Sequence, residues 1–327
     1  MWKRLAGCKM SMRFFGSDEF LETLGEVRFP GRPTSVMHAE VETEGFRLLG
    51  VGRGSRPVKD APFLDFHSPL TPTKSPSKTV RIGWLPSVER GVLDRRRWQE
   101  ERASSHLAAA PMVDWTIFSE EAEFIRHVKT SRKNLFQDSR RRMRRLEQDH
   151  GPVKMEFAAD PGGLLESCIQ WKSRQYIASG LPDLFSSEKN VSLFRRLAEK
   201  GVLVVSALFS GERLAAVHMG VVHDGRFLYW VPAYDPGLAG YAPGRLLLHF
   251  MLDESMKRRH KSFEFLLGDE DYKLHYATHV RLIGHAGTPP VFLPAWRRAR
   301  AGISSLARGL PPVHRAARTV RNRLVVR

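Results

Sequence analysis

Three apolar segments joined by two short turns, with a helical pattern directly after the third, constrain this fold more than any other feature. The segments are VLVVSALF at 202–209, RLAAVHMGVV at 213–222 and RFLYWVPAY at 226–234, separated by SGE and HDG. Strands joined by such short turns pair with each other in antiparallel order. The pattern therefore predicts an antiparallel meander that leads, through Pro243 and Gly244, into a helix over 245–259.

The turn between the meander and this helix, YAPGR at 241–245, is a candidate anion site. Backbone N–H groups in the first turn of a helix have no partner inside the helix and lie at its positive end, so they bind phosphate. Gly244 permits close approach of a ligand, and Arg245 can add a charge-assisted contact. The other interpretation is an ordinary strand-to-helix connection that contains proline and glycine.

The segments around the meander complete a characteristic order. A strand at 153–159 and two helices, at 162–180 and 190–201, precede the meander, and a strand at 262–267 follows its helix. The order of strand, two helices, three strands, helix and strand resembles that of the GCN5-related N-acetyltransferase (GNAT) fold. This resemblance implies that the turn at 241–245 holds the pyrophosphate of coenzyme A.

The chain before residue 119 has the pattern of short strands and turns. Strands at 35–42 and 46–52 are expected to form a hairpin across TEG, and VRIGWLP at 80–86 another strand. A short strand, FLDF at 63–66, is expected within a loop rich in proline and serine.

The segment from Ser119 to Gly151 has helix signals: acids in its first turn, arginines later and a glycine at its end. Ser119 is the expected N-cap. A break near Thr130 and Ser131 is expected to divide the segment into two helices that connect the halves of the chain.

The predicted fold class is α/β (α+β), with two tandem GNAT-like domains built on mixed, mainly antiparallel sheets. A chain of 327 residues is long enough for two domains that each bury a core. The predicted parts are an N-terminal acetyltransferase-like domain at 1–118, bridging basic helices at 119–151, an acyl-CoA-binding domain at 152–295 and a basic amphipathic tail at 296–327.

The net charge of +17 is unevenly distributed and indicates an anionic partner. Residues 296–327 contain nine arginines and no acid, and without them the net charge falls to +8. A second concentration, SRRRMRRLEQ at 139–148, covers most of the circumference of a helix, which is also typical of a solvated face. A membrane surface, a nucleic acid or a phosphorylated substrate would each suit this charge.

Composition argues against several other classes. No run of about 18 apolar residues is present, and the apolar stretches at the N-terminus are too short for a secretory signal, so the expected location is cytoplasmic. The two cysteines, Cys8 and Cys168, are distant in sequence and fit a reducing compartment. The histidines have no metal-ligand spacing, so no metal cofactor is expected.

Residues 263–276, FEFLLGDEDYKLHY, combine acidic, basic and phenolic side chains after a predicted strand. Acyl transfer to an amine requires a base for the ammonium proton and an acid for the leaving thiolate. Glu270 and Asp269 are the candidate carboxylates, with Glu270 as the base, and Tyr276 is the candidate acid. Alternatively, Asp269 caps the following helix and the other acids are solvated.

The helix at 162–180 carries a lysine on its apolar face. Leu165, Cys168, Ile169, Lys172 and Tyr176 share that face through their spacing of three and four residues. Lys172 either extends to the edge of the apolar surface or reaches into a cleft to meet an anion.

Together, residues 39–284 resemble the CelD/BcsL-like acetyltransferases associated with cellulose and envelope polysaccharide synthesis. QWKSRQYIASGLPDLF resembles the family's W-K-x-x-Q-Y-x-x-[ST]-G-x-x-D-x-F, and YDPGLAGYAPGRLLL resembles its Y-D-P…Y-x-P-G-x-x-L-L loop. FEFLLGDEDYKLHYA resembles F-D-F-x-x-G-D-E-x-Y-K-x-x-W-A, with Tyr276 where the family has tryptophan. DFHSPL resembles a D-[FY]-[HQ]-G turn, but Ser68 replaces its glycine, which puts a role for Asp65 and His67 in doubt.

The resemblance implies an acyl-CoA site on the second domain and an acceptor groove between the domains. The implied cofactor-binding residues are Tyr241, Ala242, Pro243, Gly244, Arg245 and Leu246. The implied acceptor-binding residues are Trp171, Lys172, Gln175, Tyr234, Tyr272 and Lys273.

The expected function is transfer of an acetyl or other acyl group from acyl-CoA to an amino group of a sugar or other envelope polysaccharide precursor. One alternative is similar to the peptidoglycan-bridge aminoacyltransferases and takes aminoacyl-tRNA, which the basic charge would suit. Only this alternative makes nucleic acid an expected partner. A second alternative is a non-catalytic module that binds a membrane or a polysaccharide synthase.

The tail at 296–327 alternates arginines with apolar residues, and Pro311 and Pro312 divide it into two segments. Each segment can form a short basic amphipathic helix that lies in the headgroup layer of an anionic membrane. That arrangement would place the protein peripherally at the inner face of the membrane. The alternative is a disordered basic tail that contacts RNA or nothing.

Overall fold

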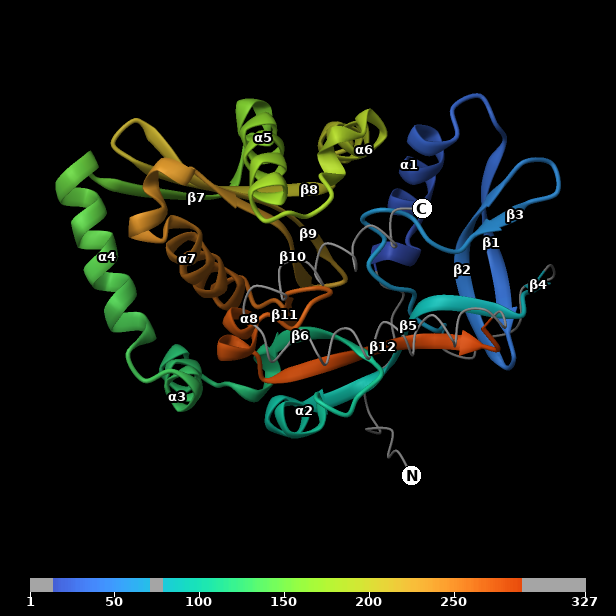
Figure 1. Cartoon of the computed structure of the whole chain (residues 1–327), viewed down its shortest axis with the longest axis horizontal. Helices are drawn as coiled ribbons and strands as arrows, with labels where there is room; N and C mark the ends of the chain where they lie inside the picture. Colours follow the sequence, from blue (N-terminus) through green and yellow to red (C-terminus); the bar gives the residue numbers. More distant parts are fainter. Residues whose placement is uncertain (1–13, 71–78, 290–327) are drawn as a thin grey trace.

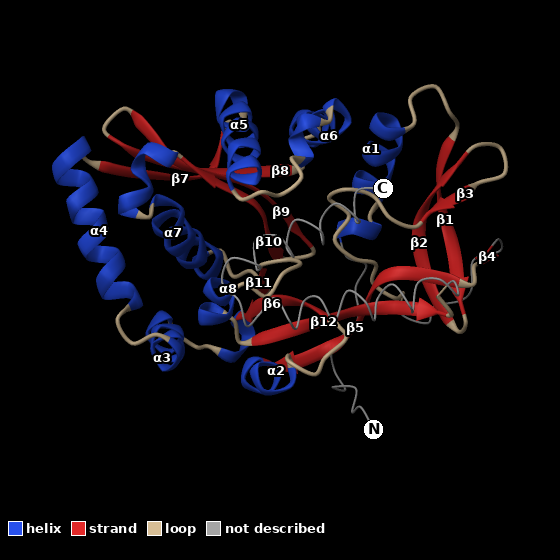
Figure 2. Cartoon of the chain, in the orientation of Figure 1, coloured by secondary structure: helices blue, strands red, loops and turns tan. Residues whose placement is uncertain are grey.

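The computed structural model describes residues 14–70 and 79–289, which form two sheets with helices packed around them (Figure 1, Figure 2). The amphipathic helices predicted at 296–327 lie outside the described residues. Across the described ranges, no helix is both long and apolar enough to cross a bilayer. The predicted mixed α/β class is confirmed.

A four-stranded sheet, in the order β3-β2-β1-β4, forms from the N-terminal part of the described chain. The predicted hairpin is confirmed, because β1 and β2 pair antiparallel along their whole length. β4 adds to β1 in parallel, and α1 packs against β1 and β2. The elements are α1 (Asp18–Arg28), β1 (Thr34–Val41), β2 (Glu44–Val51), β3 (Arg56–Val58) and β4 (Thr79–Arg81).

An eight-stranded sheet, in the order β5-β12-β6-β11-β10-β9-β8-β7, forms the centre of the molecule. The predicted meander β8-β9-β10 is antiparallel, as expected, and the sheet contains one parallel pair, β10 with β11. The strands are β5 (Trp84–Asp94), β6 (Ala108–Asp114), β7 (Val153–Ala159), β8 (Leu203–Ser210), β9 (Arg213–His223), β10 (Arg226–Tyr234), β11 (Ser262–Glu264) and β12 (His279–Gly287).

Helices cover both faces of the large sheet. α5 and α6 lie on one face of the meander, and α7 lies on the other (Figure 1). α2 and α8 lie near β5, β6 and β12. The helices are α2 (Arg95–Glu101), α3 (Glu121–Ser131), α4 (Leu135–His150), α5 (Gly162–Ala178), α6 (Glu188–Glu199), α7 (Pro243–Lys257) and α8 (Asp271–Tyr276).

One apolar core contains residues from both sides of the predicted domain boundary at 118/119. Phe20 of α1 and Phe66 of the following loop belong to the same buried cluster as Ile169, Phe194 and Val231. Strands β5 and β6, which precede the boundary, are likewise paired with β11 and β12, which follow it. Burial of this shared surface is the main favourable term that holds the two halves together.

Two strands of the first half differ from expectation. FLDF at 63–66 is not a strand but part of a loop, in which Phe63 has a φ of 67°. The loop continues into a single bridge between His67 and Val88 of β5. VRIGWLP divides into β4 and β5, because the chain bends at Gly83 and the two strands join different sheets.

The bridging helices form as expected but begin one residue later. α3 ends at Ser131 and α4 begins at Leu135, in agreement with the predicted break, and Gly151 ends α4 with a φ of 95°. The N-cap of α3 is Glu120 rather than Ser119. Ser119 instead donates its backbone N–H to the Glu123 carboxylate at 2.7 Å.

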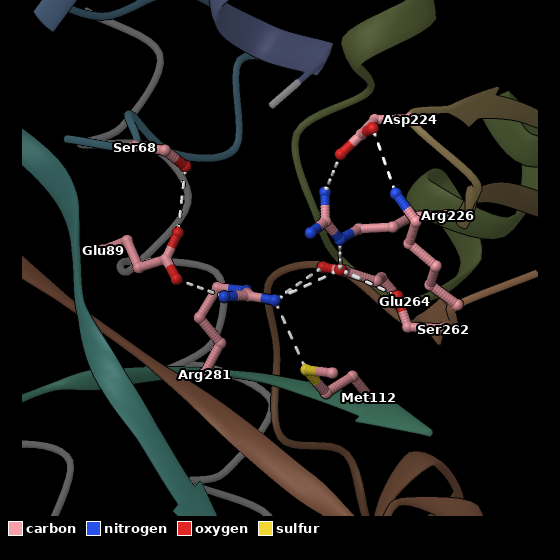
Figure 3. A network of polar contacts seen from close by, with 9 residues as sticks. Ser68, Glu89, Met112, Asp224, Arg226, Ser262, Glu264 and Arg281 are labelled. Carbon is pink, nitrogen blue, oxygen red and sulfur yellow. Dashed lines mark hydrogen bonds and ion pairs between the residues drawn. The ribbon is translucent and has the colours of Figure 1, made fainter. Parts of the chain in front are cut away.

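A buried ion network connects the strands at the centre of the large sheet (Figure 3). Arg281 of β12, only 2% exposed, lies between Glu89 of β5 and Glu264 of β11, and its Nη2 is 3.1 Å from the Glu264 Oε1. Ser68 donates to the other oxygen of Glu89 at 3.0 Å. The network also reaches Arg226 of β10 through Glu264. Buried charges require such paired partners because their desolvation is costly.

We expect Arg281→Met to lower the free energy of unfolding by about 3–5 kcal/mol, because the change leaves two buried carboxylates without their shared cation. Urea denaturation followed by circular dichroism measures this. The matched control is Arg195→Met, which removes an exposed pair with Glu166 and should cost about 1 kcal/mol or less. Equal losses in the two variants would contradict a structural role for the buried network.

Candidate functional site

Strands β10 and β11 diverge after three residue pairs. They pair in parallel only from Arg226↔Ser262 to Leu228↔Glu264. Beyond that point β10 continues to Tyr234 along β9, whereas the chain after β11 follows β6, with the Phe265 N–H bonded to the Pro111 carbonyl at 2.9 Å. The divergence leaves the second half of β10 without a strand partner on that side.

The chain that leaves β11 has an unusual backbone. Leu266 has a φ of 57°, in the left-handed region that branched residues rarely adopt, and Gly268 has a φ of 118°. A Cβ built on Gly268 would lie 2.6 Å from the Oε2 of Glu270. Only glycine therefore fits at 268, and non-glycine residues in such conformations are concentrated at functional sites.

Two charged side chains from different parts of the sequence hold the Leu267 peptide. Asp65, from the loop of the first half, accepts the Leu267 N–H at 3.1 Å. Lys273 of α8 donates to the Leu267 carbonyl at 3.2 Å and lies 3.0 Å from the Glu270 carboxylate. Lys273 is only 6% exposed. The loop thus carries a compact group of two carboxylates and one ammonium.

Lys172 does reach inward from the apolar face of α5. Its Nζ donates to the Pro232 carbonyl of β10 at 3.1 Å and lies 5.4 Å from the centre of the Tyr176 ring. Burial lowers the pKa of Lys172, and the charges of Lys273 and Glu270 also act on it. The structure therefore brings Lys172 together with Glu270 and Lys273 where β10 and β11 diverge.

Burial raises the pKa of Asp65 to about 6, although the Leu267 N–H and Lys273 act in the opposite direction. The carboxyl thus changes its charge close to neutral pH, which suits proton transfer. His67, in contrast, is not suited to proton transfer near neutral pH. It is 4% exposed, with Nε2 3.0 Å from the Lys59 carbonyl, and burial lowers its pKa to about 4.

The other residues predicted on the 263–276 segment lie in different environments. Tyr272 is 41% exposed, and the Glu270 charge contributes to its raised pKa after burial. Asp269 is exposed and does not cap α8, whose N-cap is Glu270. Tyr276 is 1% exposed, and its hydroxyl is 2.7 Å from Nε2 of His249 on α7.

The remaining predicted acceptor residues lie on α5 and at the end of β10. Trp171 packs against the core that α5 covers. The Gln175 Nε2 is buried and has no hydrogen-bond partner within the described residues. Tyr234 ends β10, and its ring lies against Gly244.

The turn predicted to bind an anion leads into the N-terminus of α7. After the short helix η4 (Pro236–Tyr241), Ala242 adopts the left-handed conformation with a φ of 53° and is the N-cap of α7. Pro243 and Gly244 occupy the first turn, and a Cβ on Gly244 would meet only the Tyr234 ring, at 3.4 Å. Leu246 is buried beneath this turn. Pro243 has no N–H, and the N–H groups of Arg245 and Leu246 bond to the Ala242 carbonyl at 3.0 and 3.2 Å. The Gly244 N–H is therefore the first-turn donor that remains for a ligand.

Helix α4 packs beside this turn through its arginines. Arg142 donates to the Gly240 carbonyl, and the Arg145 guanidinium lies 5.4 Å from the centre of the Tyr241 ring. Arg245 pairs with Asp138 of α4. Burial alone would raise the pKa of Asp138, but hydrogen bonds from Arg245 and two α4 arginines hold it well below its usual range. Part of the arginine run therefore positions the turn and is not simply a solvated face.

Within the described ranges, no group of three or more histidine, cysteine, aspartate or glutamate side chains could hold a metal ion.

The family comparison matches a part of the chain that contains Lys172, the α7 turn, Glu270 and Lys273. Residues 133–274 match the model of the acetyltransferase (GNAT) domain family. The chain carries a GNAT acetyltransferase domain and is an acyltransferase. The narrower CelD/BcsL resemblance is not established by this match. No curated protein matches the sequence.

Three solved structures are similar to this chain at low sequence identity, and the first of them shares its fold. FemX is 8% identical with a TM-score of 0.50, over 84% of this chain and 91% of its own. L-PGS from Bacillus licheniformis is 12% identical with a TM-score of 0.43, over 88% of this chain and 96% of its own. A tandem GNAT protein from the clavulanic acid biosynthesis pathway is 12% identical with a TM-score of 0.35, over 83% of this chain and 88% of its own.

Asp65 is the residue that sequence reasoning left without a role. Its signal was the DFHSPL turn, but Ser68 in place of glycine weakened the motif. Nothing in the sequence places this turn beside Leu267, which lies 202 residues away. Tertiary packing of the first half onto the loop after β11 creates the contact.

We expect Asp65→Asn to stabilise the fold at pH 7–8. The folded-state pKa of about 6 lies above the ordinary 3.8, so ionisation of Asp65 destabilises the folded state as the pH rises between these values. Urea denaturation from pH 4 to pH 8 should show a gain for the variant above pH 6 that disappears near pH 4. Asp253→Asn, which removes a surface pair with Lys257, is the control and should show no such trend. A constant difference across the range would disprove the raised pKa.

Proposed function

We propose that this acyltransferase transfers an acyl group from acyl-CoA to an amino group of a sugar or other envelope polysaccharide precursor. The observation that carries the proposal is the combination of two features on one pair of diverging strands. The first turn of α7 follows β10 after the short helix η4, and the group of Lys172, Glu270 and Lys273 lies where the strands separate. A phosphate-bearing thioester donor and a polar acceptor would both find complementary groups there.

The residues of the turn fit the pyrophosphate of acyl-CoA. Gly244 has no side chain, and the space around its Cα is limited only by the Tyr234 ring. The Gly244 N–H supplies a donor at the positive end of α7. Arg245 and the α4 arginines contribute positive charge around the turn, and Arg245 is held in place by Asp138.

The reaction requires one bond to form and one to break. The acceptor nitrogen attacks the thioester carbonyl carbon, the C–N bond forms and the C–S bond breaks. The nitrogen gives up a proton, and the leaving thiolate takes one. The cations of Lys172 and Lys273 near the acceptor favour the neutral amine over the ammonium, which is the nucleophilic form.

We assign proton acceptance to Glu270 because its side chain is 38% exposed and can meet an incoming amine. Asp65, which holds the Leu267 N–H, positions the loop that carries Glu270. Tyr276 is the proposed proton donor to the thiolate. Burial raises the pKa of its hydroxyl, which keeps it protonated, and His249 orients it.

Gly244→Val should abolish acetyl-CoA binding and leave the fold intact, because the new side chain occupies the space that a pyrophosphate needs. Calorimetric titration with acetyl-CoA measures this, and Gly240→Val, in the same region with open space around its Cα, is the control. Unchanged affinity of the Gly244 variant would remove the turn from donor binding. Binding of aminoacyl-tRNA in place of acetyl-CoA would support the alternative donor.

Lys172→Met and Glu270→Gln should each lower kcat by about 100-fold or more, since general acid–base assistance contributes at least this much. Thiol release from acetyl-CoA with amino-sugar acceptors measures the rate. Glu254→Gln, on the surface of α7, is the control and should retain full activity. Turnover within a few-fold of wild type in both site variants would show that these assignments are wrong.

A further inference from the structure

A polar cleft of about 370 Å³ lies among three helices away from the proposed acyl-transfer site. α2 contributes Arg95, Arg96 and Gln99, the end of α3 contributes Thr130 and Ser131, and α8 contributes His275. Every one of these side chains can donate a hydrogen bond, and none is acidic. The lining therefore favours an anionic ligand.

Arg95 is a buried cation that lacks an anionic partner in the described part of the chain. Its side chain is 4% exposed, and its two Nη atoms donate to the neutral hydroxyls of Ser131 and Thr130. Its Nε is buried and has no hydrogen-bond partner there. Burial and the neighbouring Arg96 both lower the pKa of Arg95, whereas Asp94 opposes them. Buried charges are normally paired, so this arrangement is incomplete without an anion.

Arg281, the buried arginine of the central network, differs from Arg95 in its partners. Arg281 is similarly inaccessible, but two carboxylates, Glu89 and Glu264, neutralise it. The acids nearest to the cleft do not do this for Arg95. Asp94 accepts the backbone N–H of Arg96 at 2.7 Å, and Asp271 lies 3.3 Å from Arg102. Within the described residues, neither arginine that lines the cleft forms an ion pair with a carboxylate.

We propose that this cleft binds the phosphate monoester group of a small molecule. A phosphate monoester can accept from several directions at once, as the donors of α2, α3 and α8 require, and its second negative charge matches the second arginine. Arg95 forms the floor, and Arg96 and His275 close over the ligand from α2 and α8. Because the cleft is open and larger than a phosphate, the ligand also carries an organic part.

The site is separate from the proposed donor turn but connected to the acyl-transfer site by α8. His275 of this short helix lines the cleft, and Lys273, two residues earlier, contacts Glu270 and the Leu267 carbonyl. A ligand in the cleft thus contacts the same helix that carries the proposed acceptor group.

Calorimetric titration of the full chain with hexose 6-phosphate at low ionic strength tests the proposal. Arg96→Gln should weaken binding by about tenfold or more, since it removes one charge-assisted contact. The matched control is Arg97→Gln, which changes the net charge equally but removes a side chain that pairs with Glu101 outside the cleft. Arg95→Gln should abolish binding, and circular dichroism of each variant establishes that it folds.

Two further arms identify the site and the chemical group. Gly244→Val should bind hexose 6-phosphate as wild type does, whereas loss of binding in that variant alone would place the ligand at the α7 turn and overturn the proposal. Dimethyl phosphate, a diester with one negative charge, should bind at least tenfold more weakly than the monoester. Equal affinity for the diester, or equal losses in the Arg96 and Arg97 variants, would also overturn it.

Discussion

The fold depends on the balanced burial of charge around Arg281. This arginine of β12 joins Glu89 of β5 to Glu264 of β11, so one cation holds together strands that are remote in sequence. In a low-dielectric interior a single unpaired charge is very costly, which ties the positions of the three strands to one another. β11 leads directly into Leu266 and Gly268. Because the network fixes the position of β11, it also fixes where the loop of the proposed acceptor group begins.

In the acceptor group, too, charged side chains lie beside side chains of opposite charge. Asp65 and Glu270 lie near Lys273, and Lys172 approaches from α5. Two carboxylates and two amines can exchange a proton at little electrostatic cost, because each change of charge has a compensating neighbour. Arg95 differs, since its guanidinium donates to two hydroxyls and, within the described residues, pairs with no carboxylate. Two carboxylates neutralise Arg281, whereas no carboxylate of the described residues pairs with Arg95. An external anion could therefore bind beside Arg95.

Much of the second half could be predicted from local pattern alone. The meander, α5, α7 and the turn at Gly244 follow from period, turn residues and helix stop signals, which act over a few residues. Lys172 was identifiable because its position on an apolar face conflicts with its charge. By contrast, FLDF has the composition of a strand but forms a loop, because its flanking segments and the packing of Phe63 and Phe66 in the shared core override its local preference.

The sequence by itself determined the order of elements in the second half, the mixed α/β class and the GNAT resemblance, since these depend on contacts between neighbours along the chain. Tertiary structure alone decided which distant groups meet. It placed Asp65 against the Leu267 peptide, paired Arg281 with acids from two other strands, and brought α2, α3 and α8 around Arg95. These contacts follow from how the two halves pack together, and the energy of that packing is spread over many apolar side chains that no short motif contains.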